Sequence, residues 1–468
     1  MAEEWDLLRR ALAEALGADA VLADAAARGA YAVQGRAPAL VARPADADGV
    51  GRALALASEA GAAVVPWGGG TSMALGYPPR AVDLVLSLER LNAVVAHDPA
   101  DLTATVQAGC TVEHVARALA PARQMLPLDA PLPARATIGG TLATGLAGPR
   151  RLLYGNPRDL LLGVRVVDAS GVLTSAGGRV VKNVTGYDLT KLYVGSLGTL
   201  GVLVEANFKL VPIPEAEGTV LATAGEPVRA LAAAQALTDG PVAPAAVAVL
   251  PLAALPQLAS RIPAADGEVV VAARFPGPAA AVERALDEGR AAARAAGCHR
   301  VARLDGAAQT AVWAAIADFP ALVDRPADEA LLKLSVLPSE LGTVVETAGA
   351  VAAEHGLRLL WLADAGTGTT YLQVRAARAA ASANGHGALD AAKESVEGAE
   401  ALAPGLGALQ DMLAHRWRTA VVLACAPELK VNLAIWGANP PAIELMHDIK
   451  HRFDPTGTLN PGRFVGGL

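Results

Sequence analysis

Three glycine-rich segments are the parts of this sequence whose residue types and spacing point to ligand binding. They occupy residues 67–72 (WGGGTS), 136–151 (ATIGGTLATGLAGPRR) and 194–206 (VGSLGTLGVLVEA). Without side chains, glycines let a ligand approach the backbone, where successive N–H groups can hold phosphate oxygens. Each segment alone also fits an ordinary tight turn. Three in this order favour one extended ligand that contains a pyrophosphate and is held largely by main chain.

Two common phosphate motifs are absent from the sequence. Gly-Lys never occurs, which excludes the GxxxxGK[ST] loop, and no GxGxxG follows the strand before residue 68. The three cysteines, Cys110, Cys298 and Cys425, are far apart and form no CxxC pair, so no zinc or iron–sulfur site is predicted in this chain. His447 and His451 are four residues apart on a predicted helix, a spacing that metal sites use, but the sequence shows no third ligand for them. We therefore interpret the pair as part of a solvated helix face.

Composition favours a well-buried globular protein. Of the 468 residues, 53% are hydrophobic and 18% are charged, with 39 basic against 46 acidic side chains. The net charge of −7 argues against a nucleic-acid surface. The sequence has no apolar run of the roughly 18 residues that cross a bilayer, and its acidic, amphipathic N-terminus is unlike a signal peptide. We therefore expect a cytoplasmic protein with at most indirect membrane contact.

The elements that must position these segments divide the chain into three parts. Residues 1–214 contain helices and short strands that alternate, including a hairpin that turns at residues 169–171. Residues 215–435 mix strand-like runs with alanine-rich helices, which suits an antiparallel sheet with helices on one face. Residues 436–468 contain one helix that stops at Asp454-Pro455, followed by a coil rich in proline and glycine.

Several motifs together resemble one family. PWGGGTS, ATIGGTLATGLAGPRR, GYDLTKLYVGSLGTLGVL and FDPTGTLNPGRF are similar to the FAD-linked oxidases of the vanillyl-alcohol oxidase type. More narrowly, RQMLPLDAP, RVVKNVTGYDL and APELKVNLAIWG resemble the FAD-binding subunits of bacterial glycolate oxidases. The resemblance covers about residues 40–214 and 420–468. It implies an α+β fold: a PCMH-type FAD-binding domain of two α+β subdomains, a cap domain with an antiparallel sheet covered by helices, and a C-terminal tail that returns to the flavin.

The resemblance also implies which residues contact FAD. It carries the pyrophosphate role to Trp67, Gly68, Gly69, Gly70, Thr71 and Ser72. It carries contacts to the flavin ring and ribityl chain to Thr137, Ile138, Gly139, Gly140, Ala143, Thr144 and Gly145. Further contacts are implied for Asp129, Gly198, Thr199, Gly201, Val202 and Asn460. Relatives with covalent FAD use a histidine in the first loop, and this chain has none there, so we predict non-covalent FAD.

The chain departs from the family at its catalytic motif. Hydroxy-acid dehydrogenases of this type carry HxGDGNxH, whereas residues 364–371 here read DAGTGTTY. Asp364 and Tyr371 replace the two histidines, so the catalytic base stays unassigned. The glycolate oxidase resemblance implies a small 2-hydroxy-acid substrate, a second FAD subunit and an iron–sulfur partner in a hetero-oligomer. Alternatives are a non-catalytic FAD-bearing scaffold and a stand-alone FAD-linked enzyme for another hydroxy acid.

Two roles are open for the arginines near these motifs. Arg150, Arg151 and Arg158 would contact phosphate or substrate, or would form salt bridges at the surface and at helix ends. Lys182, Tyr187 and Asp188 are expected to brace their loop rather than to do chemistry.

Overall fold

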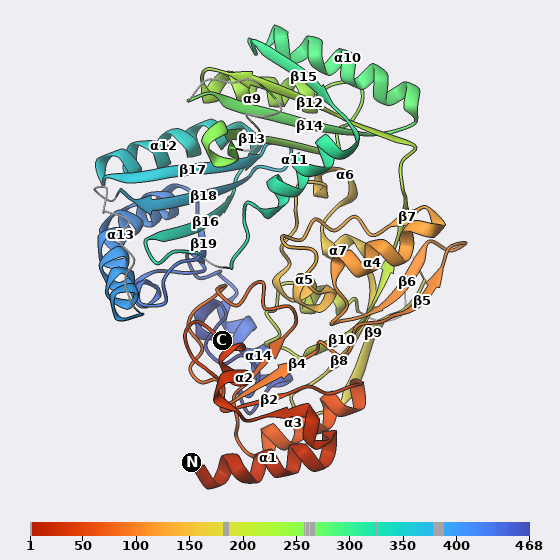
Figure 1. Cartoon of the computed structure of the whole chain (residues 1–468), viewed down its shortest axis with the longest axis vertical. Coiled ribbons are helices and arrows are strands. Elements are labelled where there is room, and N and C mark those ends of the chain that lie inside the picture. The colour runs from red at the N-terminus through yellow and green to blue at the C-terminus, as the bar shows by residue number, and fades with distance from the viewer. Residues whose placement is uncertain are drawn as a thin grey trace. The chain divides into compact units, whose positions relative to one another are not determined.

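The structure, a computed structural model, describes residues 2–180, 187–256, 258, 262, 267–323, 325–377 and 388–468. Lys182 lies outside these residues. The chain forms two compact units (Figure 1). The first comprises Met1–Gly148, Gly155–Ile213 and Asn439–Leu468. The second comprises Pro149–Tyr154 and Pro214–Ala438, so the structure groups a short segment after the second glycine loop with the second unit.

The first unit opens with a small sheet that carries the first glycine segment. Its strand order is β1 (Val21–Leu22), β2 (Leu40–Ala42), β4 (Leu84–Ser87), β3 (Val64–Trp67). Both β2 and β3 pair in parallel with β4. Parallel strands are usually buried on both faces, which explains the apolar runs in these segments. Helices α1 (Ala2–Leu16) and α3 (Ala47–Glu59) pack beside the sheet.

An antiparallel sheet forms the other half of the first unit. Its order is β5 (Val94–Asp98), β6 (Thr103–Gln107), β10 (Val202–Lys209), β8 (Leu161–Val167), β9 (Leu173–Gly177). The β8–β9 pairing confirms the hairpin predicted around residues 169–171. The remaining elements are α2 (Ala25–Gly29), α4 (Val112–Leu119), α5 (Ile138–Thr144), α7 (Pro157–Leu160), α8 (Thr190–Tyr193) and the pair β7 (Gln124–Met125) and β11 (Val211–Pro212).

The C-terminal segment is anchored in the first unit. Helix α14 (Ile443–Phe453) carries Lys450, whose buried Nζ donates to the carbonyls of Thr199 (2.8 Å) and Leu459 (2.9 Å) and pairs with Asp454. The coil then runs beside β3, where the N–H of Asn460 donates to the carbonyl of Val64 (2.9 Å). These contacts fix the coil next to the strand that leads into the first glycine segment.

The second unit is built on one eight-stranded antiparallel sheet. The strands, in spatial order, are β15 (Arg300–Leu304), β12 (Ala216–Ala224), β14 (Val269–Gly277), β13 (Ala246–Pro251), β17 (Leu357–Asp364), β18 (Thr369–Ala376), β16 (Glu329–Ser335) and β19 (Val421–Ala424). Its helices are α6 (Arg151–Tyr154), α9 (Pro227–Thr238), α10 (Ala279–Ala295), α11 (Gly306–Asp318), α12 (Leu341–Glu354) and α13 (Ala388–Arg416).

Helices cover the two faces of this sheet unequally. Helices α9, α10 and α12 lie along one face (Figure 1), where Gly289 of α10 packs close to Val220 of β12. Thr219, the neighbour of Val220, points to the opposite face because side chains alternate along a strand. There it accepts a hydrogen bond from the indole of Trp313 in α11 (2.9 Å). No helix among the described residues is long and apolar enough to span a membrane.

Candidate functional site

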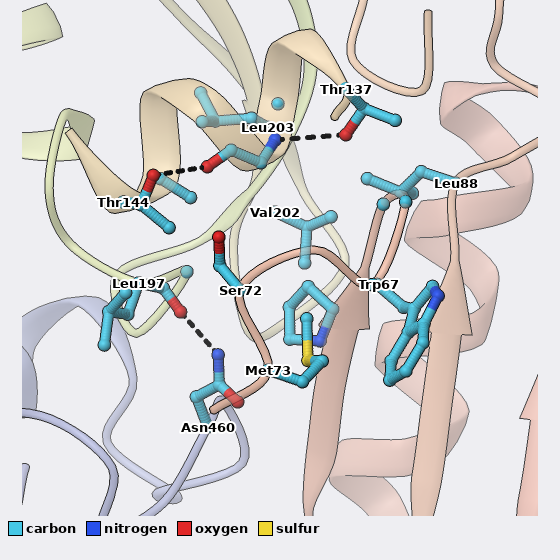
Figure 2. A pocket seen from close by; sticks show the side chains of 18 of the residues that line it. Trp67, Ser72, Met73, Leu88, Thr137, Thr144, Leu197, Val202, Leu203 and Asn460 are labelled. Atoms are coloured by element: carbon cyan, nitrogen blue, oxygen red, sulfur yellow. Dashed lines mark hydrogen bonds between the residues drawn. The ribbon is translucent and has the colours of Figure 1, made fainter. Parts of the chain in front are cut away.

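The three glycine segments and the C-terminal coil line one pocket in the first unit (Figure 2). The space between these segments measures about 720 Å³, including its open mouth. The predicted residues that line it are Trp67, Gly68, Gly69, Gly70, Thr71, Ser72, Thr137, Gly139, Gly140, Ala143, Thr144, Gly198, Gly201, Val202 and Asn460. Segments that are distant in sequence therefore share one cavity, as a single extended ligand requires.

The glycines of the first loop allow it to pack against the second loop. A Cβ atom on Gly68 would lie 2.1 Å from Thr137 Oγ1, and one on Gly69 would lie 1.7 Å from the carbonyl oxygen of Arg135. Gly70 has a φ of +69° and sits against the ring of Trp67. The absent side chains thus serve the contact between two protein loops as much as the approach of a ligand.

Threonines in the second loop order helix α5. Thr137 caps the helix, and its Oγ1 accepts a hydrogen bond from the N–H of Gly140 (3.3 Å). Thr144 Oγ1 donates to the carbonyl of Gly140 (3.0 Å), and both bonds are drawn in Figure 2. Because these hydroxyls are engaged within the helix, they order the part of the pocket wall that Gly139 and Gly140 line.

The third loop is connected to the C-terminal coil. The side-chain amide of Asn460 donates to the carbonyl of Leu197 (Figure 2). Within this loop, Gly201 has a φ of +157°, and a Cβ atom there would lie 2.5 Å from Val166 of β8. Asn460 therefore closes one side of the pocket by holding the third loop in place.

Arg463 is a pocket residue that the sequence analysis missed. Its guanidinium donates to the carbonyls of Met73 (2.8 Å) and Leu75 (2.9 Å) and to Asn460 Oδ1 (3.3 Å). Only 3% of the residue is exposed, and this burial lowers the pKa of Arg463 to about 10, so it stays charged at neutral pH. Of the described residues that line the pocket, Arg463 is the one charged side chain, which suits an anionic ligand.

Four predicted residues lie outside the pocket lining. Ile138 and Thr199 are buried, and the carbonyl of Thr199 accepts the bond from Lys450. Gly145 ends α5 in the left-handed conformation, and Asp129 lies half-buried beside Gly148. The lining residues that the prediction omitted are Pro66, Met73, Leu88, Leu197, Leu203 and Arg463.

Of the arginines near the second loop, Arg151 has a buried ion-pair partner in the second unit. Its guanidinium lies 3.0 Å from Asp364 Oδ2, with side-chain exposures of 10% and 3%, and it also donates to Thr367 Oγ1 (2.7 Å). Asp364 and Thr367 belong to the loop that departs from the HxGDGNxH motif. Arg158 is exposed. Among the described residues, no group of three or more His, Cys, Asp or Glu side chains could hold a metal ion.

Comparison with protein families identifies two parts of the chain. A family described as "FAD binding domain" matches residues 38–177, and one described as "FAD linked oxidases, C-terminal domain" matches residues 435–464. These regions include the first two glycine segments, Asn460 and Arg463. The predicted FAD cofactor and the predicted resemblance to FAD-linked oxidases are confirmed. The glycine-lined pocket, with its buried and positively charged Arg463, fits the cofactor.

Curated relatives match over part of their length. "Glycolate oxidase subunit GlcD" of Bacillus subtilis is 40% identical over 185 residues, which cover 40% of this chain and 39% of that protein. "Glycolate oxidase subunit GlcE" of Escherichia coli is 43% identical over 143 residues, 30% of this chain and 40% of that protein. "D-2-hydroxyglutarate dehydrogenase" of Xanthomonas citri is 38% identical over 184 residues, 39% of each. The chain thus matches about 40% of the length of each relative.

Solved structures resemble the chain along nearly its whole length. p-Cresol methylhydroxylase with bound substrate gives a TM-score of 0.76 at 17% identity, covering 99% of this chain and 97% of that one. 4-Ethylphenol oxidase from Gulosibacter chungangensis gives 0.75 at 16% identity, with the same coverage. At this identity the likeness establishes the fold alone, and it confirms the predicted α+β class of PCMH type.

Proposed function

We propose that this chain, which matches the FAD binding domain and the C-terminal domain of FAD linked oxidases, is one flavin-bearing subunit of a 2-hydroxy-acid dehydrogenase. The observation that carries this proposal is the single pocket formed by the three glycine segments with Asn460 and Arg463. Relatives named as glycolate oxidase subunits and as D-2-hydroxyglutarate dehydrogenase support a small hydroxy acid as the substrate class.

The chain's residues have distinct tasks in this proposal. The backbone of residues 68–72 holds the pyrophosphate, and the buried Arg463 offsets its negative charge while it fixes the carbonyls of Met73 and Leu75. The remainder of the FAD site is lined by Thr137, Gly139, Gly140, Ala143, Thr144, Gly198, Gly201 and Val202. When bound, FAD supplies the hydride acceptor for oxidation of the carbon that bears the substrate hydroxyl. Among the described residues that line the pocket there is no histidine or cysteine, which supports non-covalent binding.

A second candidate function is an FAD-bearing subunit that relays electrons without oxidising substrate itself. The departure from HxGDGNxH favours it, because Asp364 is engaged in a buried ion pair with Arg151. In either case we propose that electrons pass from FAD to an iron–sulfur partner in a complex with a second FAD subunit. The relatives named as glycolate oxidase subunits GlcD and GlcE support such an assembly. A cytoplasmic location, with membrane contact only through partners, stays a prediction.

An anaerobic reduction experiment separates the two functions. The purified, FAD-loaded chain is mixed with glycolate and, separately, with D-lactate, and the visible absorbance of the flavin is followed. Bleaching by either acid is expected if the chain oxidises substrate itself. Full retention of the absorbance with both acids contradicts autonomous dehydrogenation and supports the relay function. Affinity purification from the native host then tests for an iron–sulfur protein that co-purifies with the chain.

A further inference from the structure

A tight hairpin turn is formed by residues 33–36 of the first unit. The N–H of Val33 donates to the carbonyl of Arg36 (2.9 Å), and the N–H of Arg36 donates to the carbonyl of Val33 (3.1 Å). The two residues between them, Gln34 and Gly35, have φ values of +50° and +81°. Positive φ at both central residues is what a type I′ turn requires. Glycine adopts this conformation readily, whereas glutamine rarely does.

The side chain of Gln34 reaches the segment that follows the first glycine loop. Its amide Nε2 donates to the carbonyls of Met73 (3.3 Å), Gly76 (3.2 Å) and Tyr77 (3.3 Å). The amide oxygen of Gln34 is buried and accepts no hydrogen bond from the described residues. Both this buried acceptor and the positive φ cost free energy. The position therefore depends on the donor groups of the amide, which oppose these costs.

The carbonyl of Met73 connects Gln34 to the pocket. It also accepts a hydrogen bond from the guanidinium of Arg463 (2.8 Å), and Met73 itself lines the pocket. Val33, beside Gln34, is fully buried in an apolar cluster against which both Met73 and Trp67 pack. Residues 73–77 are thus held by the 33–36 turn as well as by the C-terminal coil.

We propose that Gln34 is a positioning residue for FAD, which acts through the carbonyls of residues 73–77. By holding this segment in one geometry before FAD arrives, Gln34 removes an ordering cost that would otherwise weaken binding. The turn lies before residues 38–177, which match the FAD binding domain family. It is also separate from the three glycine segments. The inference rests on FAD binding in this pocket and is independent of the substrate.

Two variants separate the amide of Gln34 from the conformation of the turn. Gln34→Met keeps the length of the side chain and removes the amide. Gln34→Asn keeps an amide that is one methylene too short to reach the three carbonyls, and asparagine tolerates the left-handed conformation better than glutamine. Gln235→Met is the matched control, because Gln235 is an exposed glutamine of α9 in the second unit, where its amide donates to Asp239.

The experiment compares FAD affinity with stability. Each full-length chain is freed of FAD and titrated with FAD while the flavin fluorescence is followed, and thermal unfolding of the FAD-free chain measures its stability. The dissociation constant for FAD should rise about 5- to 30-fold in both Gln34 variants and stay within about twofold in Gln235→Met. FAD-free Gln34→Asn should unfold at a higher temperature than FAD-free Gln34→Met, because asparagine suits the turn.

Hydrogen exchange at residues 73–77 reports on the positioned segment directly. Without FAD, exchange there should be faster in both Gln34 variants than in the unsubstituted chain, and saturation with FAD should remove most of the difference. An unchanged dissociation constant in folded Gln34→Met would overturn the positioning role. Normal affinity in Gln34→Asn would do so too, since the turn alone would then suffice. A chain that binds no FAD at all would contradict the pocket itself, whereas these two outcomes contradict only the part played by Gln34.

Discussion

At the scale of single residues, two glycines and one arginine determine how the loops of the pocket pack against one another. A side chain on Gly68 would meet Thr137, and one on Gly69 would meet the backbone of Arg135. Arg463 follows Asn460 closely, but its role depends on Met73 and Leu75, whose carbonyls lie 390 and 388 residues away in sequence. A single sequence does not reveal such contacts, because nothing in the local pattern of residues 460–463 indicates their partners.

Lys333 of β16 provides a prediction that depends on pH. Burial lowers its pKa to about 8 in the folded chain against 10.5 for a free lysine, so the unfolded state binds more protons between these values. The free energy of unfolding therefore rises with pH across this window. Lys333→Met removes that dependence. The stability of the variant relative to the unsubstituted chain should fall by about 2 kcal/mol from about pH 7.5 to about pH 10.

Denaturant unfolding of both proteins at the two pH values measures this difference. Arg358→Met serves as the control, because it removes an exposed charge from the same sheet and should leave the pH dependence unchanged. A Lys333→Met variant whose relative stability is the same at both pH values would show that Lys333 keeps an ordinary pKa.

At the scale of elements, the C-terminal segment completes the first unit. The sequence predicted a helix that stops at Asp454 and a coil that returns to the flavin. The structure adds the reason, since Lys450 ties the carbonyls of Thr199 and Leu459 together around Asp454. Hydrophobic periodicity predicts the helix but not this buried lysine, whose position depends on the third glycine loop, 251 residues away in sequence.

Replacing Lys450 by methionine should loosen this segment. The change leaves Asp454 as a buried charge without its lysine and two carbonyls without their donor, which costs about 3–5 kcal/mol. Because Asn460 and Arg463 follow directly, FAD affinity should fall as well. Hydrogen exchange at residues 454–463 and thermal unfolding measure the effect.

The control for this prediction is His451→Met, at the next residue of α14, where the side chain is exposed. This variant should exchange and unfold like the unsubstituted chain. If both variants lost the same stability, the anchoring role assigned to Lys450 would be incorrect.

At the scale of the whole molecule, motif order was more informative than any single motif. Three weak glycine signals in sequence order predicted one pocket, and the structure brings most of the predicted residues to it. The second unit was predicted as an antiparallel sheet with helices, which the strand order bears out. Two pairings in this unit could not be predicted, because Arg151 and Asp364 are 213 residues apart and only strand register brings Lys333 opposite Tyr371.

The FAD content of the chain and of a Gly69→Val variant tests the central claim most directly. Valine at this position would meet the backbone of Arg135 and separate the first two glycine loops. Gly225→Val is the control, since a Cβ atom there has open space. The account predicts about one FAD per chain in the unsubstituted protein and the control, released on denaturation, and less than about a tenth of that in folded Gly69→Val. A colourless chain that does not take up FAD, or a Gly69→Val variant that binds FAD as tightly as the control, would contradict it.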